Sequence, residues 1–164
     1  MRLLVNLIIL LCMVMGSLMK KFINVYLRMK RGTRWLSVLS EIFKVIIAGS
    51  REYTDYNTLK EKVDKILARK VGEGKEIVII SGCARGADTL AIEYALEKGY
   101  PVERYPADWS LGKGAGCLRN IEMAKAADAL IAFPKLTENG YSRGTNHMIK
   151  EAEKRNLLVR VIPV

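Results

Sequence analysis

The chain has 164 residues, of which 50% are hydrophobic and 7% are aromatic. This length suits one domain with a buried core and is too short for two ordinary domains joined by linkers. The composition excludes a disordered chain, and three cysteines without a Cys-x-x-Cys spacing give no support to a disulfide framework or a zinc site. We therefore expect one globular domain in a reducing compartment, the cytoplasm.

The formal net charge of +10 is concentrated near the N-terminus. Residues 1–42 carry seven basic residues and one acidic residue, so that residues 43–164 hold a net charge of only +4. A basic excess of this size suits a domain whose ligand is a phosphate ester, and it is weak support for a nucleic-acid-binding face. The predicted partner is therefore a nucleotide or a nucleotide-derived small molecule, and nucleic acid is disfavoured.

Residues 1–42 form a hydrophobic and basic extension before the predicted domain, residues 43–164. Residues 3–19 are an apolar run at the short limit of a membrane-spanning helix, and a basic cluster follows them. Three interpretations stay open: an anchor that tethers the domain to the inner face of the membrane, a wrongly assigned start codon, and a signal peptide. The signal peptide is the least favoured, because residues 15–17 make a poor cleavage site.

From residue 43 onward, aliphatic runs alternate with segments of helical periodicity. The sequence predicts strands at 44–48, 76–81, 102–106, 129–134 and 157–163, with helices at 59–70, 87–98, 116–127 and 144–156. Strands that are hydrophobic throughout and joined by helices form parallel sheets covered on both faces. The predicted fold is therefore doubly wound α/β, with a five-stranded parallel sheet.

Glycine and polar residues gather in the loops that follow the first four predicted strands. These loops read GSREYTDY (49–56), SGCARGAD (81–88), ADWSLGKGAGCLRN (107–120) and PKLTENGYSRGTNH (134–147). In doubly wound sheets, ligands bind outside the carboxyl ends of the strands, where these loops must lie. We therefore expect the functional site at this edge of the sheet.

Two of these loops open a helix and carry an arginine. Ser81, Gly82, Arg85 and Gly86 precede one helix, and Ser142, Arg143, Gly144 and Thr145 begin another. Free N–H groups at a helix N-terminus attract anions, and an arginine can donate two hydrogen bonds to a phosphate. Neither loop matches GxxxxGK[ST] or GxGxxG, so ATP hydrolysis and nicotinamide chemistry gain no support. The sequence predicts a phosphate-bearing small molecule between the two helices.

Four blocks, VIIAGSR, SGCARGAD, PADWSLGKGAGCLRN and SRGTNHMI, resemble the YspA-like branch of the SLOG superfamily. Relatives of this branch include the LOG phosphoribohydrolases and the DNA-processing protein A group. The resemblance covers residues 44–163 and implies a Rossmann-like domain that binds a nucleotide or nucleoside-phosphate derivative; because such relatives often dimerise, a homodimer is a further prediction. The ligand loops that it implies fall on Gly49, Ser50, Arg51, Ser81, Gly82, Arg85, Gly86, Asp88, Arg119, Asn120, Gly144 and Thr145.

One departure from the LOG pattern concerns catalysis. Those enzymes resemble one another in the motif PGGxGTxxE, and alignment of its GT with Gly144 and Thr145 places Met148 at the position of the glutamate. Loss of this carboxylate removes the group best suited to stabilise an oxocarbenium ion or to activate water. The primary prediction is therefore a ligand-sensing module. The alternatives are a hydrolase or phosphoribohydrolase-like enzyme on nucleoside phosphates and, behind it, a protein that binds single-stranded nucleic acid.

Asp88, Asp108 and His147 are the catalytic candidates, and each also has a structural interpretation. Asp88 is better explained as a helix cap or a partner of Arg85, and His147 as a helix surface residue. Asp108 and Trp109 together suit a ribose hydroxyl and a nucleobase, although Trp109 equally suits a lid anchor. Asp55 and Asp88 are also candidate ligands for a hydroxyl or for Mg²⁺, the one cofactor that the sequence brings into consideration.

Overall fold

The computed structural model describes residues 41–138 and 140–164. The predicted membrane contact through residues 3–19 and nearly all of the predicted extension, residues 1–42, lie outside the described residues and stay predictions. Within the described part of the chain, no helix combines the length and the apolar character that a membrane span requires.

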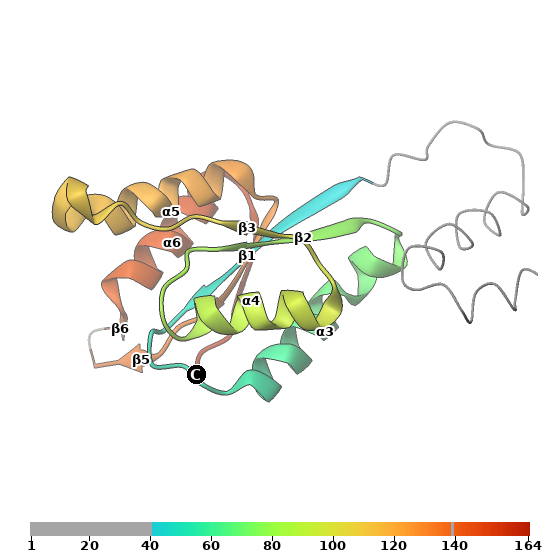
Figure 1. The fold of residues 1–164 in the computed structure, drawn as a ribbon. Coiled ribbons are helices and arrows are strands. Elements are labelled where there is room, and N and C mark those ends of the chain that lie inside the picture. Colours follow the sequence, from blue (N-terminus) through green and yellow to red (C-terminus); the bar gives the residue numbers. More distant parts are fainter. Residues whose placement is uncertain (1–40, 139) are drawn as a thin grey trace, which may run out of the picture. The chain divides into compact units, whose positions relative to one another are not determined.

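Strands and helices alternate along the described chain (Figure 1). In chain order, the elements are β1 (Ile42–Gly49), α3 (Tyr56–Gly72), β2 (Glu76–Ser81), α4 (Ala87–Lys98), β3 (Val102–Arg104), the 3₁₀-helix η1 (Trp109–Gly114), α5 (Ala115–Ala126), β4 (Ala129–Phe133), β5 (Leu136–Thr137), β6 (Gly140–Tyr141), α6 (Arg143–Lys154) and β7 (Leu158–Val161). Five strands pair in parallel in the order β3-β2-β1-β4-β7. The predicted doubly wound, Rossmann-like α/β fold is therefore confirmed.

The centre of the sheet is buried because helices cover both of its faces. Side chains of β1 alternate between two core clusters: Val45 and Ile47 pack with α3 and α4, whereas Ile46 packs with α5 and α6. All three side chains are fully buried. This two-sided burial explains why β1, β2 and β4 read as continuous aliphatic runs (Figure 1).

The strand order reverses at β1. The chain passes from β1 to β2 on one side, and after β3 it returns to β4 on the other side of β1. The Ser50 amide donates a hydrogen bond to the carbonyl oxygen of Phe133 at 2.9 Å, which joins the ends of β1 and β4. Loops that leave neighbouring strands toward opposite faces open a crevice between them, and the functional site is expected there.

The four α-helices of residues 41–164 that the structure describes differ in how they begin. Asp55 caps α3, because its side chain accepts a hydrogen bond from the Thr58 amide at 2.9 Å. No side chain caps α4, α5 or α6. The N-terminal N–H groups of these three helices therefore depend on backbone atoms, water or a ligand for partners.

Three elements were not predicted from the sequence: η1 and the two strands of the antiparallel pair, β5 and β6. Each strand of the pair has two residues, which is too short for a readable hydrophobic period. Gly112 interrupts η1 with φ +79°. The predicted strands at 102–106 and 157–163 are shorter in the structure, at 102–104 and 158–161, which is a difference of the size expected for element ends.

Candidate functional site

A cleft of about 590 Å³ lies at the carboxyl edge of the sheet. It is lined by the end of β1 and the loop after it, the loop after β2 with the start of α4, η1 with α5 as far as Met123, and the start of α6. The predicted site residues that it brings together are Gly49, Ser50, Arg51, Asp88, Trp109, Arg119, Asn120, Ser142, Arg143, Gly144 and Thr145. The volume falls within the range of small-molecule sites, about 300–1,000 Å³.

The cleft is predominantly cationic. The positively charged side chains that line it are Arg51, Lys113, Arg119 and Arg143, and the acidic ones are Glu52 and Asp88. Glu52 is already paired, because Lys135 lies 2.6 Å from its carboxylate; this hydrogen bond lowers the pKa of Glu52. The remaining positive charge favours an anionic occupant.

The N-terminal turns of α5 and α6 both face this cleft. The hydroxyl of Ser142, the first residue before α6, lies 3.0 Å from the Thr145 hydroxyl and does not cap the helix. A Cβ atom added at Gly144 would have no other atom within 4 Å. The backbone of α6 is therefore open to a close approach by an anion from the cleft.

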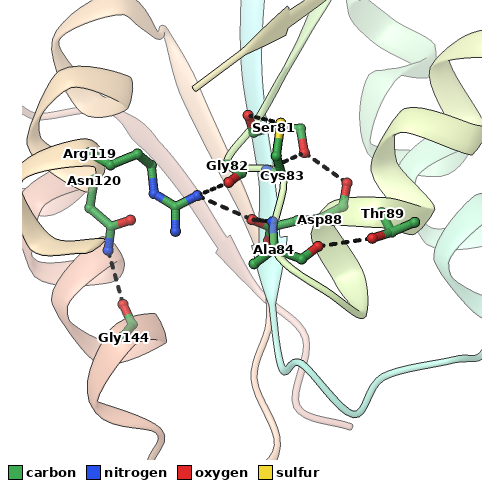
Figure 2. Close-up of polar contacts among 9 residues, drawn as sticks. All are labelled: Ser81, Gly82, Cys83, Ala84, Asp88, Thr89, Arg119, Asn120 and Gly144. Carbon is green, nitrogen blue, oxygen red and sulfur yellow. Dashed lines mark hydrogen bonds and ion pairs between the residues drawn. The ribbon is translucent and has the colours of Figure 1, made fainter. Parts of the chain in front are cut away.

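Two neighbouring residues of α5, Arg119 and Asn120, form hydrogen bonds to other segments that border the cleft (Figure 2). Arg119 donates from Nη1 to the carbonyl oxygen of Gly82, and the same nitrogen lies 3.5 Å from a carboxylate oxygen of Asp88. Asn120 donates from Nδ2 to the carbonyl oxygen of Gly144 at 3.1 Å. Helix α5 thereby connects the loop after β2 with the N-terminus of α6.

Arg119 is held by hydrogen bonding to its neighbours, and one of its N–H donors has no partner among the described residues. Its side chain is half-buried and lines the cleft, and its Nε is buried with no hydrogen-bond partner among the described residues. A buried donor without a partner carries a desolvation penalty of about 1–3 kcal/mol. Because this Nε has almost no accessible surface, a ligand in the cleft can contact it only if the Arg119 side chain moves.

Asp88 is the buried acid of the site. The residue is 4% exposed, and its carboxylate accepts a hydrogen bond from the Ala84 amide at 3.3 Å. Burial raises the pKa of Asp88 to about 6, against the opposing effects of Arg119 and nearby backbone amides. The expected pairing of Asp88 with Arg85 is wrong, since Arg119 reaches the carboxylate from α5 while Arg85 is exposed in the turn.

The other predicted residues of the SGCARGAD loop do not line the cleft. They are Ser81, Gly82, Arg85 and Gly86. Ser81 is fully buried and donates its hydroxyl to the carbonyl oxygen of Asp88 at 2.7 Å. A Cβ atom at Gly82 would collide with the Arg119 guanidinium, and one at Gly86 would collide with the backbone of the loop after β1. Ser81, Gly82 and Gly86 therefore pack behind the cleft, whereas Arg85 is exposed.

Two of the three catalytic candidates lie away from the cleft wall. Asp108 is exposed and caps η1, where hydrogen bonds from Ser110 lower its pKa. His147 is half-buried on α6, and its Nδ1 has no partner among the described residues. Asp88 alone of the three lines the cleft. Met148, aligned with the LOG glutamate, also lines it and is buried.

Lys113 and Cys117 also line the cleft and were not predicted from the sequence. Their position in the glycine-rich loop after β3 was the available signal, because that loop leads directly into Arg119. Among residues 41–138 and 140–164, no group of three or more His, Cys, Asp or Glu side chains is placed to hold a metal ion. Mg²⁺ therefore stays a prediction.

Comparisons with known proteins agree with this fold. A sequence profile of the YspA, cpYpsA-related SLOG family matches residues 43–112. The Gene 61 protein of Mycobacterium phage D29 is 40% identical over 124 residues, which cover 71% of this chain and 93% of that protein. DNA processing protein A (DprA) from Streptococcus pneumoniae is similar in structure, with a TM-score of 0.55 and 20% identity over 76% of this chain. The matched part is 51% of that DprA chain, and the likeness concerns the fold alone.

Proposed function

Since the chain belongs to the YspA, cpYpsA-related SLOG family, we propose that its cleft binds a nucleotide or nucleoside-phosphate derivative as a ligand-sensing module. One observation carries the proposal. Two helices without side-chain caps, α5 and α6, point their N-terminal turns at a cleft lined by four cationic side chains. Phosphate groups are the common biological anions that such a site fits best.

The binding groups complement one another chemically. The N–H groups of α6 offer directional donors, and Arg143 at the same turn adds a charged pair of donors. Hydrogen bonds to charged groups contribute about 1.5–3 kcal/mol each, roughly twice the value for neutral pairs. Arg119 and Lys113 extend the positive surface along α5 and η1. A ligand with one or more phosphates is therefore favoured over a neutral metabolite.

A pair of arginines provides a matched test. Arg143, the first residue of α6, and Arg85, in the loop before α4, are both exposed at the same edge of the sheet, but only Arg143 lines the cleft. We expect nucleoside mono-, di- and triphosphates to raise the melting temperature of the full-length protein, measured with and without Mg²⁺. Arg143→Ala should weaken the strongest hit by about 10- to 100-fold in calorimetry, and Arg85→Ala should leave its affinity within about twofold. Equal losses in both variants would contradict the proposed site.

Hydrolysis of a nucleoside phosphate is the second candidate, and Asp88 favours it. A carboxyl group whose pKa is raised to about 6 by burial, in the wall of a cleft, is suited to proton transfer near neutral pH. The test is release of free base or phosphate from the same panel of nucleotides. Turnover that disappears in Asp88→Asn while ligand binding persists would favour the enzyme, and binding without any product would favour the sensing module.

A further inference from the structure

Trp109 is a large apolar side chain in an unusual place. It is 60% exposed, yet it lines the same cleft as the cationic side chains. Its ring is also supported from behind, because a Cβ atom at Gly116 on α5 would lie 3.7 Å from the ring carbon Cη2. This distance is that of an ordinary van der Waals contact, so the indole lies beside the first turn of α5. The indole is therefore supported by α5 and open to solvent.

The backbone that carries Trp109 is fixed as well. Asp108, directly before it, accepts hydrogen bonds from the amide and the hydroxyl of Ser110, at 3.0 and 2.6 Å. These bonds close the first turn of η1 around Trp109. A rigid aromatic surface loses little conformational entropy when a ligand stacks on it, which makes it an efficient binding group.

We propose that Trp109 is the stacking surface for the nucleobase of the ligand, so that the cleft selects nucleoside phosphates over sugar phosphates that lack a base. This inference rests on the proposed function and deepens it. The cationic groups and helix N-termini of the cleft suit the phosphate end of such a ligand. The flat, apolar face of the base needs an aromatic partner rather than a charged one, and indole is a large aromatic surface on which a base can stack.

A docking surface for a second copy of the chain is the competing explanation of this exposed ring. Leu111 on η1 and Leu118 on α5 are exposed too, at 63% and 49%, but neither lines the cleft. A protein partner would use the leucines together with the indole, whereas a nucleobase in the cleft would use Trp109 alone. Leu111→Ala is therefore the matched control for Trp109→Ala.

The experiment compares ligands with and without a base. The affinities of the four common nucleoside monophosphates and of ribose 5-phosphate are measured by calorimetry for the full-length wild-type protein, Trp109→Ala, Trp109→Phe and Leu111→Ala. For the best-bound nucleotide, we expect Trp109→Ala to weaken binding by about 10- to 100-fold and Trp109→Phe by less than about fivefold. Leu111→Ala should have no effect, and ribose 5-phosphate should bind wild type and Trp109→Ala equally.

A spectroscopic measurement reports on the contact itself. The chain has two tryptophans, and the second, Trp35, lies outside the described residues. In a Trp35→Phe background the nucleotide should quench the fluorescence of Trp109, and ribose 5-phosphate should not. The inference is overturned if Trp109→Ala leaves nucleotide affinity unchanged and the nucleotide leaves the fluorescence of Trp109 unchanged. The proposed function would still stand in that case.

Two further outcomes separate the alternatives. A shift from dimer to monomer in both Trp109→Ala and Leu111→Ala, with unchanged nucleotide affinity, would overturn the stacking role in favour of an interface between copies. Absence of binding by all the nucleotides and by ribose 5-phosphate would overturn the proposed function and the stacking role together. Analytical ultracentrifugation of each variant gives the oligomeric state.

Discussion

Replacement of Asp88 by asparagine should stabilise the protein at neutral pH, although it removes a charge that is paired with arginine. Asp88 is 4% exposed, and its nearest cation, Arg119, lies at 3.5 Å. Burial raises the pKa of Asp88 to about 6, so desolvation of the carboxylate outweighs the attraction of Arg119. Asparagine keeps the size and the acceptor oxygen of the side chain, and it carries no charge that must be desolvated.

The expected gain in the free energy of unfolding follows from the pKa values of Asp88 in the folded and unfolded states. The folded pKa of about 6 exceeds the reference value of 3.8, and the difference corresponds to about 3 kcal/mol. Below the reference value the carboxyl is protonated in both states and the substitution changes little. As pH rises from 3.8 to about 6, the unfolded chain loses its proton first, so the stability of the wild type falls relative to Asp88→Asn. Above pH 6 the difference stays constant.

Urea denaturation of both proteins, followed by circular dichroism at several values of pH, measures this difference directly. Asp108→Asn serves as the control, because hydrogen bonds from Ser110 lower the pKa of that exposed carboxylate, and its loss should decrease stability at neutral pH. The reasoning is refuted if Asp88→Asn is less stable than the wild type at pH 8, or if the difference does not shrink toward pH 4.

Two glycine substitutions test the wall and the mouth of the cleft. Gly86→Ala should destabilise the protein by about 3 kcal/mol or more, because its φ of +76° is strained for alanine and the new Cβ meets the backbone of the loop after β1. Gly99→Ala, with φ +68° and free space around it, should cost only about 1 kcal/mol in the same denaturation assay, and equal losses would contradict the contact. Gly144→Ala should raise stability by roughly 0.5 kcal/mol and weaken nucleotide binding by about tenfold, since its methyl group enters the open space at α6. If Gly144→Ala leaves nucleotide affinity unchanged, the phosphate does not bind at the first turn of α6.

The fold was predictable because its signals are local. Continuous aliphatic runs identify β1, β2 and β4 as strands buried on two faces, and Gly99 ends α4 in the left-handed conformation that is typical of a glycine cap. Alternation of strands and helices then leaves few arrangements other than a doubly wound sheet. The order of the strands determines where the loops meet, so the cleft followed from the fold.

The assignment of roles within the site was less accessible, because it depends on contacts between distant segments. Arg85 and Arg119 carry the same chemistry, and the sequence alone does not reveal that Arg119 pairs with Asp88 while Arg85 faces solvent. Gly82 was expected to face the ligand, yet its missing side chain accommodates the Arg119 guanidinium. The residue pattern thus located the site, and packing decided which side chains form the surface and which form the support.

Three features that oppose stability meet at this one cleft. Asp88 is a buried carboxylate with an unfavourable ionisation, α5 and α6 begin without side-chain caps, and Trp109 exposes most of its ring. Away from the cleft, the Asp55 side chain caps α3. Local departures from the most stable arrangement are expected where a ligand supplies the missing interactions. The uncapped helices lack an acceptor for their N–H donors and Trp109 lacks an aromatic partner, and a nucleoside phosphate is a single molecule that supplies both.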